Sequence, residues 1–178
     1  MAASPRTSPA PSTTEAALAL FDSLEPVALD AMIGIWAGKE YPTRHPMDGL
    51  LSATGWYGKQ FLDADTVHPL LFHTADRQAV FAVDPARLPM GLPVPTSWPL
   101  HRVVTTARPF LRTSKPAARL RTTEYRGVAT ATMIYDAKPI HDVFRRLDAD
   151  SLLGAMDYRG FDRPYFFVLR REPGTTVL

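Results

Sequence analysis

Seventeen prolines and 10 glycines are spread through the 178 residues of this chain. Proline lacks a backbone donor and glycine weakens helices, so both residues interrupt regular structure. The regular elements must therefore be short, which favours strands and turns over long helices. A chain of this length fits one domain around a single core.

Composition excludes several classes of protein. The net charge of +2 selects no partner, and no basic run indicates nucleic-acid binding. The chain has no cysteine, which excludes disulfides and cysteine-ligated zinc. No apolar run approaches the ~20 residues needed to cross a membrane, and the N-terminus lacks the pattern of a signal peptide. We therefore expect a cytoplasmic protein with neither a nucleic-acid partner nor a membrane partner.

The N-terminal residues divide into a tail and a helix. Residues 1–11, MAASPRTSPAP, are small, polar and rich in proline, which predicts a disordered tail before one domain over residues 12–178. Ser12 and Glu15 have the spacing of a capping box. The apolar residues that follow lie on one helical face, and Pro26 ends the pattern, so we expect a short amphipathic helix.

The stretch AMIGIWAGKEY, residues 31–41, predicts the first long strand, with Met32, Gly34, Trp36 and Gly38 on one face. Glycines on either side of a tryptophan leave room for its ring, or for something stacked on it. In DGLLSATGWYGKQF, residues 48–61, Asp48 has the position of an N-cap and apolar residues follow at helical spacing. This segment predicts a short helix after the first strand.

The remaining elements are predominantly strands. Apolar runs predict strands at residues 68–74 and 79–84, a hairpin of 118–125 with 128–136, and a closing pair at 151–160 and 164–172. Residues 84–100 contain five prolines, which indicates a loop or a lid. The pattern at residues 139–148 suits a helix or an edge strand, and both alternatives stay open.

Two blocks of the sequence resemble a known family. Gly34-x-Trp36-x-Gly38, with HPMDGLL and GWYGKQF after it, resembles the bacterial family named for its GXWXG motif. The block RLRTTEYRGVATATMIYDAKPIHDVFRRLD resembles the domain of unknown function that accompanies this motif. The blocks cover residues 30–75 and 116–171. The Gly-x-Trp triplet is also similar to that of the calycins, more distantly to nitrobindin-like proteins, which implies a closed or nearly closed antiparallel β-barrel with the tryptophan sealing one end.

Candidate functional residues are those that a barrel would direct into a cavity. For ligand binding they are Trp36, Trp56, Tyr57, Phe61, Tyr125 and Met133. For acid–base chemistry, if the protein is an enzyme, they are His45, Lys59, His68 and Tyr135. The five histidines have no metal-binding spacing, so we expect no metal site. Core packing is the competing interpretation for Trp36 and the tyrosines.

These observations favour a small-molecule binding protein that holds an apolar or amphipathic ligand in a barrel cavity. The segment from His101 to Arg126 contains seven Lys or Arg residues and one acid, so a basic rim that attracts an anionic ligand is one interpretation. One alternative is an enzyme that runs isomerase, cyclase or lyase chemistry in the same pocket. The resemblance to nitrobindin-like proteins adds a haem alternative, with His45, His68 or His141 as axial ligand. The sequence leaves the cofactor unknown and a homodimer open.

Overall fold

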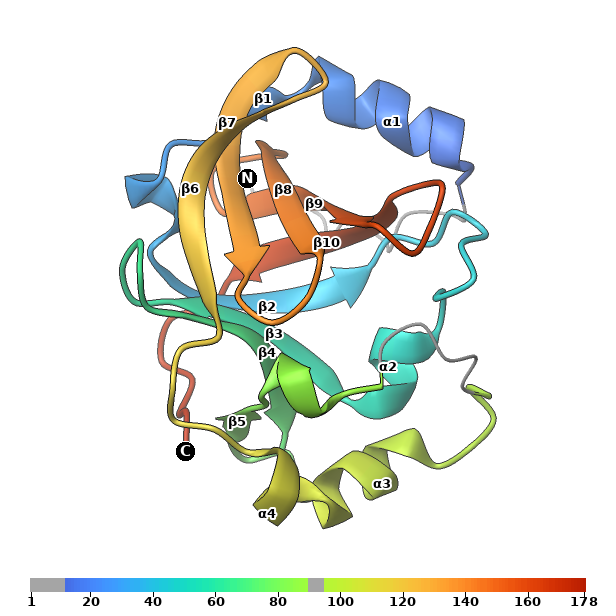
Figure 1. Cartoon of the computed structure of the whole chain (residues 1–178), viewed down its shortest axis with the longest axis vertical. Coiled ribbons are helices and arrows are strands. Elements are labelled where there is room, and N and C mark those ends of the chain that lie inside the picture. Colours follow the sequence, from blue (N-terminus) through green and yellow to red (C-terminus); the bar gives the residue numbers. More distant parts are fainter. Residues whose placement is uncertain (1–11, 90–94) are drawn as a thin grey trace, which may run out of the picture.

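The computed structural model describes residues 12–89 and 95–178, and its main element is one antiparallel sheet (Figure 1). The strands expected from the sequence are present, and the segment 139–148, for which helix and strand were both open, forms a strand over Ile140–Arg146. The predicted tail, residues 1–11, and residues 90–94 of the predicted lid lie outside the described residues. The strands are β1 (Glu25–Pro26), β2 (Gly34–Glu40), β3 (Trp56–Phe61), β4 (Val67–His73), β5 (Val80–Ala82), β6 (Ala118–Tyr125), β7 (Val128–Tyr135), β8 (Ile140–Arg146), β9 (Ser151–Tyr158) and β10 (Tyr165–Arg171).

The sheet curls back on itself as a partial ring. The order of neighbouring strands is β1–β8–β7–β6–β4–β3–β2–β10–β9, with β5 paired on β4. A further pairing joins β8 to β9. The link between β4 and β6 is one residue pair, Val67 with Ala118, so the ring is weakest there. Side chains on its inner face form the largest core cluster.

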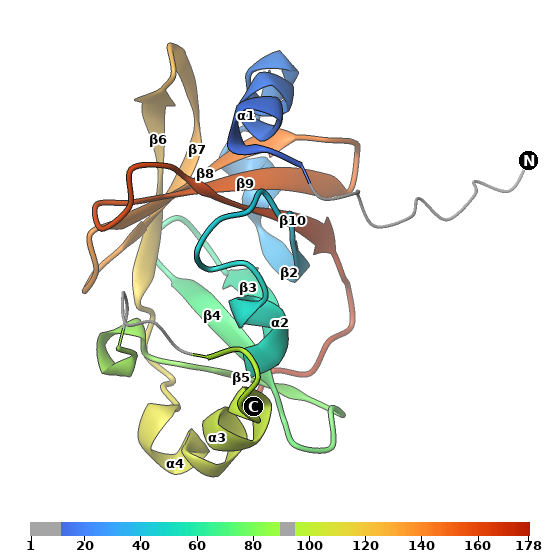
Figure 2. The same cartoon turned by 90° about the vertical axis from the view of Figure 1, so that its right-hand side faces the viewer.

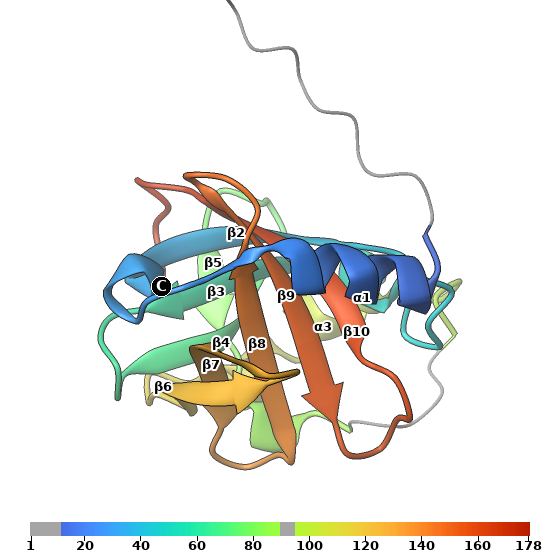
Figure 3. The same cartoon turned by 90° about the horizontal axis from the view of Figure 1, so that it is seen from above.

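The helices lie at opposite ends of the sheet (Figures 1 and 2). Helix α1 (Thr14–Ser23) crosses the outer face of β8, β9 and β10, where its Phe21 packs against Phe166 (Figure 3). The expected capping box is wrong, because Thr13 is the N-cap and its side chain accepts from the backbone N–H of Ala16. Helices α2 (Leu50–Thr54), α3 (Leu100–Thr106) and α4 (Arg108–Leu111) lie together at the other end. Two 3-10 turns are η1 (Asp30–Met32) and η2 (Pro85–Arg87).

The helix expected from Asp48 to Phe61 is shorter than predicted. It ends at Thr54 because Gly55, with a φ of 76°, forms a left-handed C-cap, and residues from Trp56 onward continue as β3. Asp48 is not its N-cap: the Asp48 carboxylate accepts from the backbone N–H groups of residues 43 and 45. The Glu40 carboxylate accepts from the first backbone N–H groups of α2 instead.

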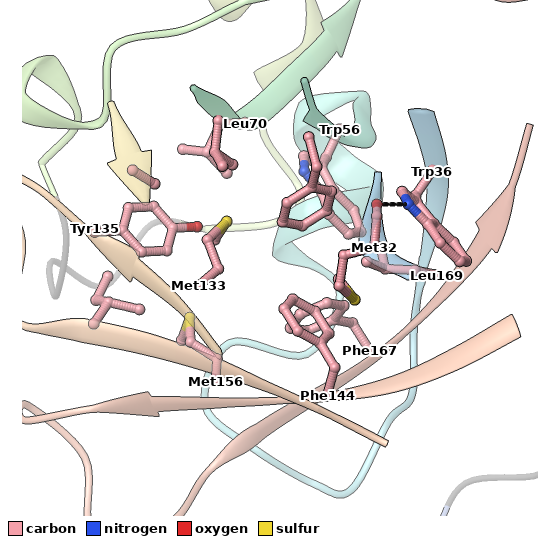
Figure 4. Packing of buried hydrophobic residues seen from close by; sticks show 14 of the residues in the cluster. Met32, Trp36, Trp56, Leu70, Met133, Tyr135, Phe144, Met156, Phe167 and Leu169 are labelled. Carbon is pink, nitrogen blue, oxygen red and sulfur yellow. Dashed lines mark hydrogen bonds between the residues drawn. The ribbon is translucent and has the colours of Figure 1, made fainter. Parts of the chain in front are cut away.

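The Gly-x-Trp-x-Gly motif determines how Trp36 and Trp56 pack in the interior. The indole N–H of Trp36 donates to the Met32 carbonyl at 2.7 Å (Figure 4), and the Arg171 guanidinium stacks on the other side of the ring, 4.3 Å from its centroid. At Gly38, a Cβ atom would lie 2.1 Å from the Trp56 ring. The second glycine therefore gives Trp56 its place on the inner face.

Gly58 tolerates a side chain even less than Gly38 does. It lies at the β-bulge in the pairing of β3 with β4, and this bulge directs Trp56 and Lys59 to the same side of the sheet. Its φ is 152°, and an added Cβ atom would lie 1.9 Å from the Trp36 carbonyl oxygen. This neighbour is backbone and cannot move aside without disturbing β2.

We expect Gly58→Ala to lower the free energy of unfolding by on the order of 3 kcal/mol, because backbone must shift to admit the methyl group. Gly127→Ala is the matched control. Gly127 also has a positive φ, of 78°, but nothing lies within 4 Å of its Cβ position, so the cost is about 1 kcal/mol. Urea denaturation of both variants measures the difference, and equal losses would contradict this role of Gly58.

Candidate functional site

A cavity of about 340 Å³ lies between the inner face of the sheet and helices α2, α3 and α4. Its walls are almost entirely apolar. Figure 4 shows Trp56, Leu70, Tyr135, Met156 and Phe167 directed toward a common interior. We call α2, α3 and α4 the lid helices. Together with the residue between α3 and α4, they contribute Leu50, Leu51, Thr54, Leu100, Val103, Val104, Ala107 and Leu111. Val103 also remains 54% exposed, so the cavity opens to solvent beside α3.

One ion pair lies in this apolar wall. The ammonium of Lys59 on β3 is 2.7 Å from the Oδ2 atom of Asp142 on β8, and the two side chains are 3% and 1% exposed. Lys59 Nζ also donates to the Pro69 carbonyl at 3.1 Å and to the Tyr135 hydroxyl at 3.4 Å. The Tyr135 hydroxyl donates in turn to Asp142 Oδ2 at 3.5 Å. The contacts of Lys59 with Tyr135 and Asp142 connect β3 to β7 and β8, which are not neighbours of β3 in the sheet.

Aromatic rings surround the ammonium. Lys59 Nζ lies 5.6 Å from the ring centroids of both Trp56 and Tyr135, and 5.0 Å from that of Phe167. Ring faces attract a cation, and the attraction grows when water is excluded. The rings therefore help to hold the charge of Lys59 in an otherwise apolar wall.

Burial shifts the titration of all three groups. It lowers the pKa of Lys59, against the attraction of Asp142, and it raises the pKa of Asp142, against the attraction of Lys59. Burial, together with the Asp142 carboxylate, raises the pKa of Tyr135 well above its ordinary value. The hydroxyl of Tyr135 is therefore a neutral donor, and the ion pair is neutral as a unit.

Three buried polar atoms of the lining residues have no hydrogen-bond partner among residues 12–89 and 95–178. They are Asp142 Oδ1, the Trp56 indole N–H and the Tyr165 hydroxyl. Buried polar groups are nearly always paired, and an unpaired one costs about 1–3 kcal/mol. All three belong to residues that line the cavity, and they comprise one acceptor and two donors.

The basic segment found in the sequence divides into two groups. On β6 and its turn, Arg119, Arg121 and Arg126 each pair with an aspartate. The segment 102–115, which includes most of α3, all of α4 and the residues after it, has four cations without an ion-pair partner within the described part of the chain. They are Arg102, Arg108, Arg112 and Lys115. A basic rim therefore exists, but it lies on the outside of the lid helices.

The structure brings together three of the predicted site residues. Trp56, Lys59 and Tyr135 all line the cavity. Three others, Trp36, Phe61 and Met133, belong to the same core cluster but do not line the cavity. Tyr57 and Tyr125 face outward: Tyr57 packs with Leu71 and bonds Thr175, and Tyr125 packs on Phe21 of α1.

The predicted histidines lie outside the cavity wall. His45 is buried between the rings of Phe161 and Tyr165, and His68 lies on β4 opposite Gln60. Burial lowers the pKa of both, so both are neutral near pH 7. His141 is exposed on β8. Among the described residues, no group of three His, Asp or Glu side chains is placed to hold a metal ion.

Sequence reasoning missed Asp142 and the helices α3 and α4. The strand interpretation of residues 139–148 contained a signal for Asp142, because Ile140, Asp142 and Phe144 then share one face. A lone acid between two large apolar residues at a period of two marks a buried charge. Helices α3 and α4 follow a proline-rich stretch and are short, so their pattern in the sequence is weak.

The fold and the site define a mainly β protein with a lidded apolar cavity, and comparison with known proteins places it in a family. The family described as GXWXG protein matches residues 19–77, and the domain of unknown function DUF4334 matches residues 116–171. The chain belongs to this family of GXWXG proteins with a C-terminal DUF4334 domain. The residues between the two matches include α3 and α4.

A solved structure supports the same assignment. A crystal structure of a protein from Thermomonospora curvata is 34% identical, with a TM-score of 0.66, and the match covers 87% of this chain and 84% of that chain. No curated protein matches the chain. Within residues 12–89 and 95–178, no helix has both the length and the apolar character needed to cross a membrane.

We expect Lys59→Met to lower the free energy of unfolding by about 3–5 kcal/mol, because it leaves Asp142 buried without its partner. The double variant Lys59→Met/Asp142→Leu should recover most of this loss, since it removes both charges. Denaturant titration of the single and double variants checks both expectations.

The pH dependence of Lys59→Met gives the control. Burial raises the pKa of Asp142 above its value in the unfolded chain, so the protonated acid is favoured in the fold and stability falls as pH rises through the raised pKa. Lys59→Met should therefore be more stable at about pH 5 than at about pH 8, relative to the double variant. A loss independent of pH would contradict the pairing.

Proposed function

We propose that this protein binds an apolar or amphipathic small molecule in the cavity between the sheet and the lid helices. The observation that carries the proposal is a cavity of about 340 Å³ with apolar walls and a few polar side chains among its lining residues. Ligand pockets have volumes of roughly 300–1,000 Å³ and the same composition. A molecule of this class would gain about 25 cal/mol for each Å² of apolar surface removed from water.

We further propose that the partial ring is a barrel of the calycin type. Its support is the circuit of pairings through β8, β7, β6, β4, β3, β2, β10 and β9, which returns to β8. The position of Trp36 below the cavity also agrees with this class. In such a barrel, the interior is the ligand site and the loops and helices at one end control entry.

The arrangement of the polar groups favours binding over acid–base catalysis. Lys59 Nζ already contacts three oxygen atoms, those of Asp142, Pro69 and Tyr135, which match the three donors of an ammonium group. A catalytic base needs a lone pair that faces its substrate. The haem alternative gains no support either, because no histidine is among the lining residues.

We expect the neutral dye N-phenyl-1-naphthylamine to bind with one-to-one stoichiometry and increased fluorescence. Leu70→Trp should weaken this binding by about tenfold or more, because the larger ring occupies the cavity. Leu62→Trp is the matched control, since Leu62 is 52% exposed and does not line the cavity. The same affinity in both variants would place the dye elsewhere and overturn the proposal.

A further inference from the structure

We infer that the ligand carries an uncharged hydroxyl group at its buried end, so that this protein selects apolar alcohols over carboxylic acids of the same chain length. The inference rests on the proposed function, because it names the class of molecule that the same cavity takes. It differs from the interpretation of the basic segment in the sequence, which suggested an anionic ligand.

The charge balance of the cavity wall is the first argument. Lys59 is the buried cation among the lining residues, and Asp142 at 2.7 Å already neutralises it. Its other donors reach the Pro69 carbonyl and the Tyr135 hydroxyl. Two further cations line the cavity, but Arg87 is exposed and Lys138 is only half-buried. A carboxylate at the buried end would therefore face the Asp142 charge beside a cation that is already paired. Such a burial costs several kcal/mol.

The unpaired atoms supply the second argument. Asp142 Oδ1 can only accept a hydrogen bond while Asp142 is ionised, so its partner must be a donor. The indole N–H of Trp56 can only donate, and the Tyr165 hydroxyl can donate or accept. A hydroxyl group carries a proton that it can donate to Asp142, and its oxygen can still accept a hydrogen bond. A carboxylate has no proton to offer Asp142.

The basic rim does not reverse this preference. Its four cations lie on the segment 102–115, where Arg102, Arg112 and Lys115 are exposed. An exposed ion pair contributes about 0–1 kcal/mol and is screened by salt. Burying an uncompensated carboxylate beside Asp142 costs more than the rim returns, so the interior determines the preference.

A series of three ligands tests the inference in the wild-type chain by displacement of N-phenyl-1-naphthylamine at about pH 7.5. Decanol should bind about tenfold or more tightly than decanoate, because only decanoate brings a charge. Decanol should also bind about fivefold or more tightly than decyl methyl ether, which lacks the hydroxyl proton. Decanoate or the ether binding as tightly as decanol would overturn the inference.

The variant Asp142→Asn should shift the preference from decanol toward decanoate, a change that a purely apolar pocket would not show. Without the Asp142 charge, Lys59 is an unpaired cation in the cavity wall. Decanoate should therefore gain affinity relative to decanol by about tenfold or more compared with the wild-type chain. An unchanged ratio in a folded Asp142→Asn variant would contradict the inference.

Tyr165→Phe decides the question if Asp142→Asn does not fold. This change removes one unpaired hydroxyl and preserves the ring, so decanol affinity should fall by about fivefold relative to dye affinity. An equal effect on both ligands, or on neither, would refute a hydroxyl site at this position. Dye binding without a preference for decanol refutes this inference alone, whereas the absence of any dye binding refutes the proposed function.

Discussion

The contact between Lys59 and Asp142 is the interaction on which the proposed ligand preference of this cavity depends. It joins β3 to β8, two strands that the order of the sheet keeps apart, and it places a balanced pair of charges in an apolar wall. A buried pair gives little net stability compared with apolar side chains of the same size. The pair therefore supports the proposal of a ligand site in the cavity. In that proposal, the ligand donates a hydrogen bond to Asp142 Oδ1, which has no partner among the described residues.

The Gly-x-Trp-x-Gly motif prepares the position of this pair. Trp36 is fixed by its bond to Met32 and its stacking with Arg171. Gly38 lets the edge of the Trp56 ring approach β2 closely, and this ring is one of those around the Lys59 ammonium. The motif therefore acts on the site indirectly, because it positions the Trp56 ring that packs beside Lys59. The lid helices cover the opposite side of the cavity.

The sequence predicted the strands well because their alternation is regular and their turns carry proline or glycine. Three of the residues that it singled out, Trp56 and Lys59 on β3 and Tyr135 on β7, line the cavity. It failed where local pattern and tertiary position differ. Apolar spacing after Asp48 suggested a longer helix, but Gly55 ends the helix in a left-handed conformation. Tyr125 had the alternation of a lining residue, yet α1 covers that side of the sheet. Asp142 depends on a partner 83 residues earlier in the chain, a distance that no local pattern can report.

The most direct test of this account is the carbon-13 chemical shift of the Asp142 carboxyl group, measured by nuclear magnetic resonance during a titration with decanol. The account predicts that this shift changes in parallel with occupancy of the cavity, because a hydroxyl donates to the free oxygen, and that Asp142 remains ionised throughout. A carboxyl shift that stays constant while decanol binds in the cavity would contradict it.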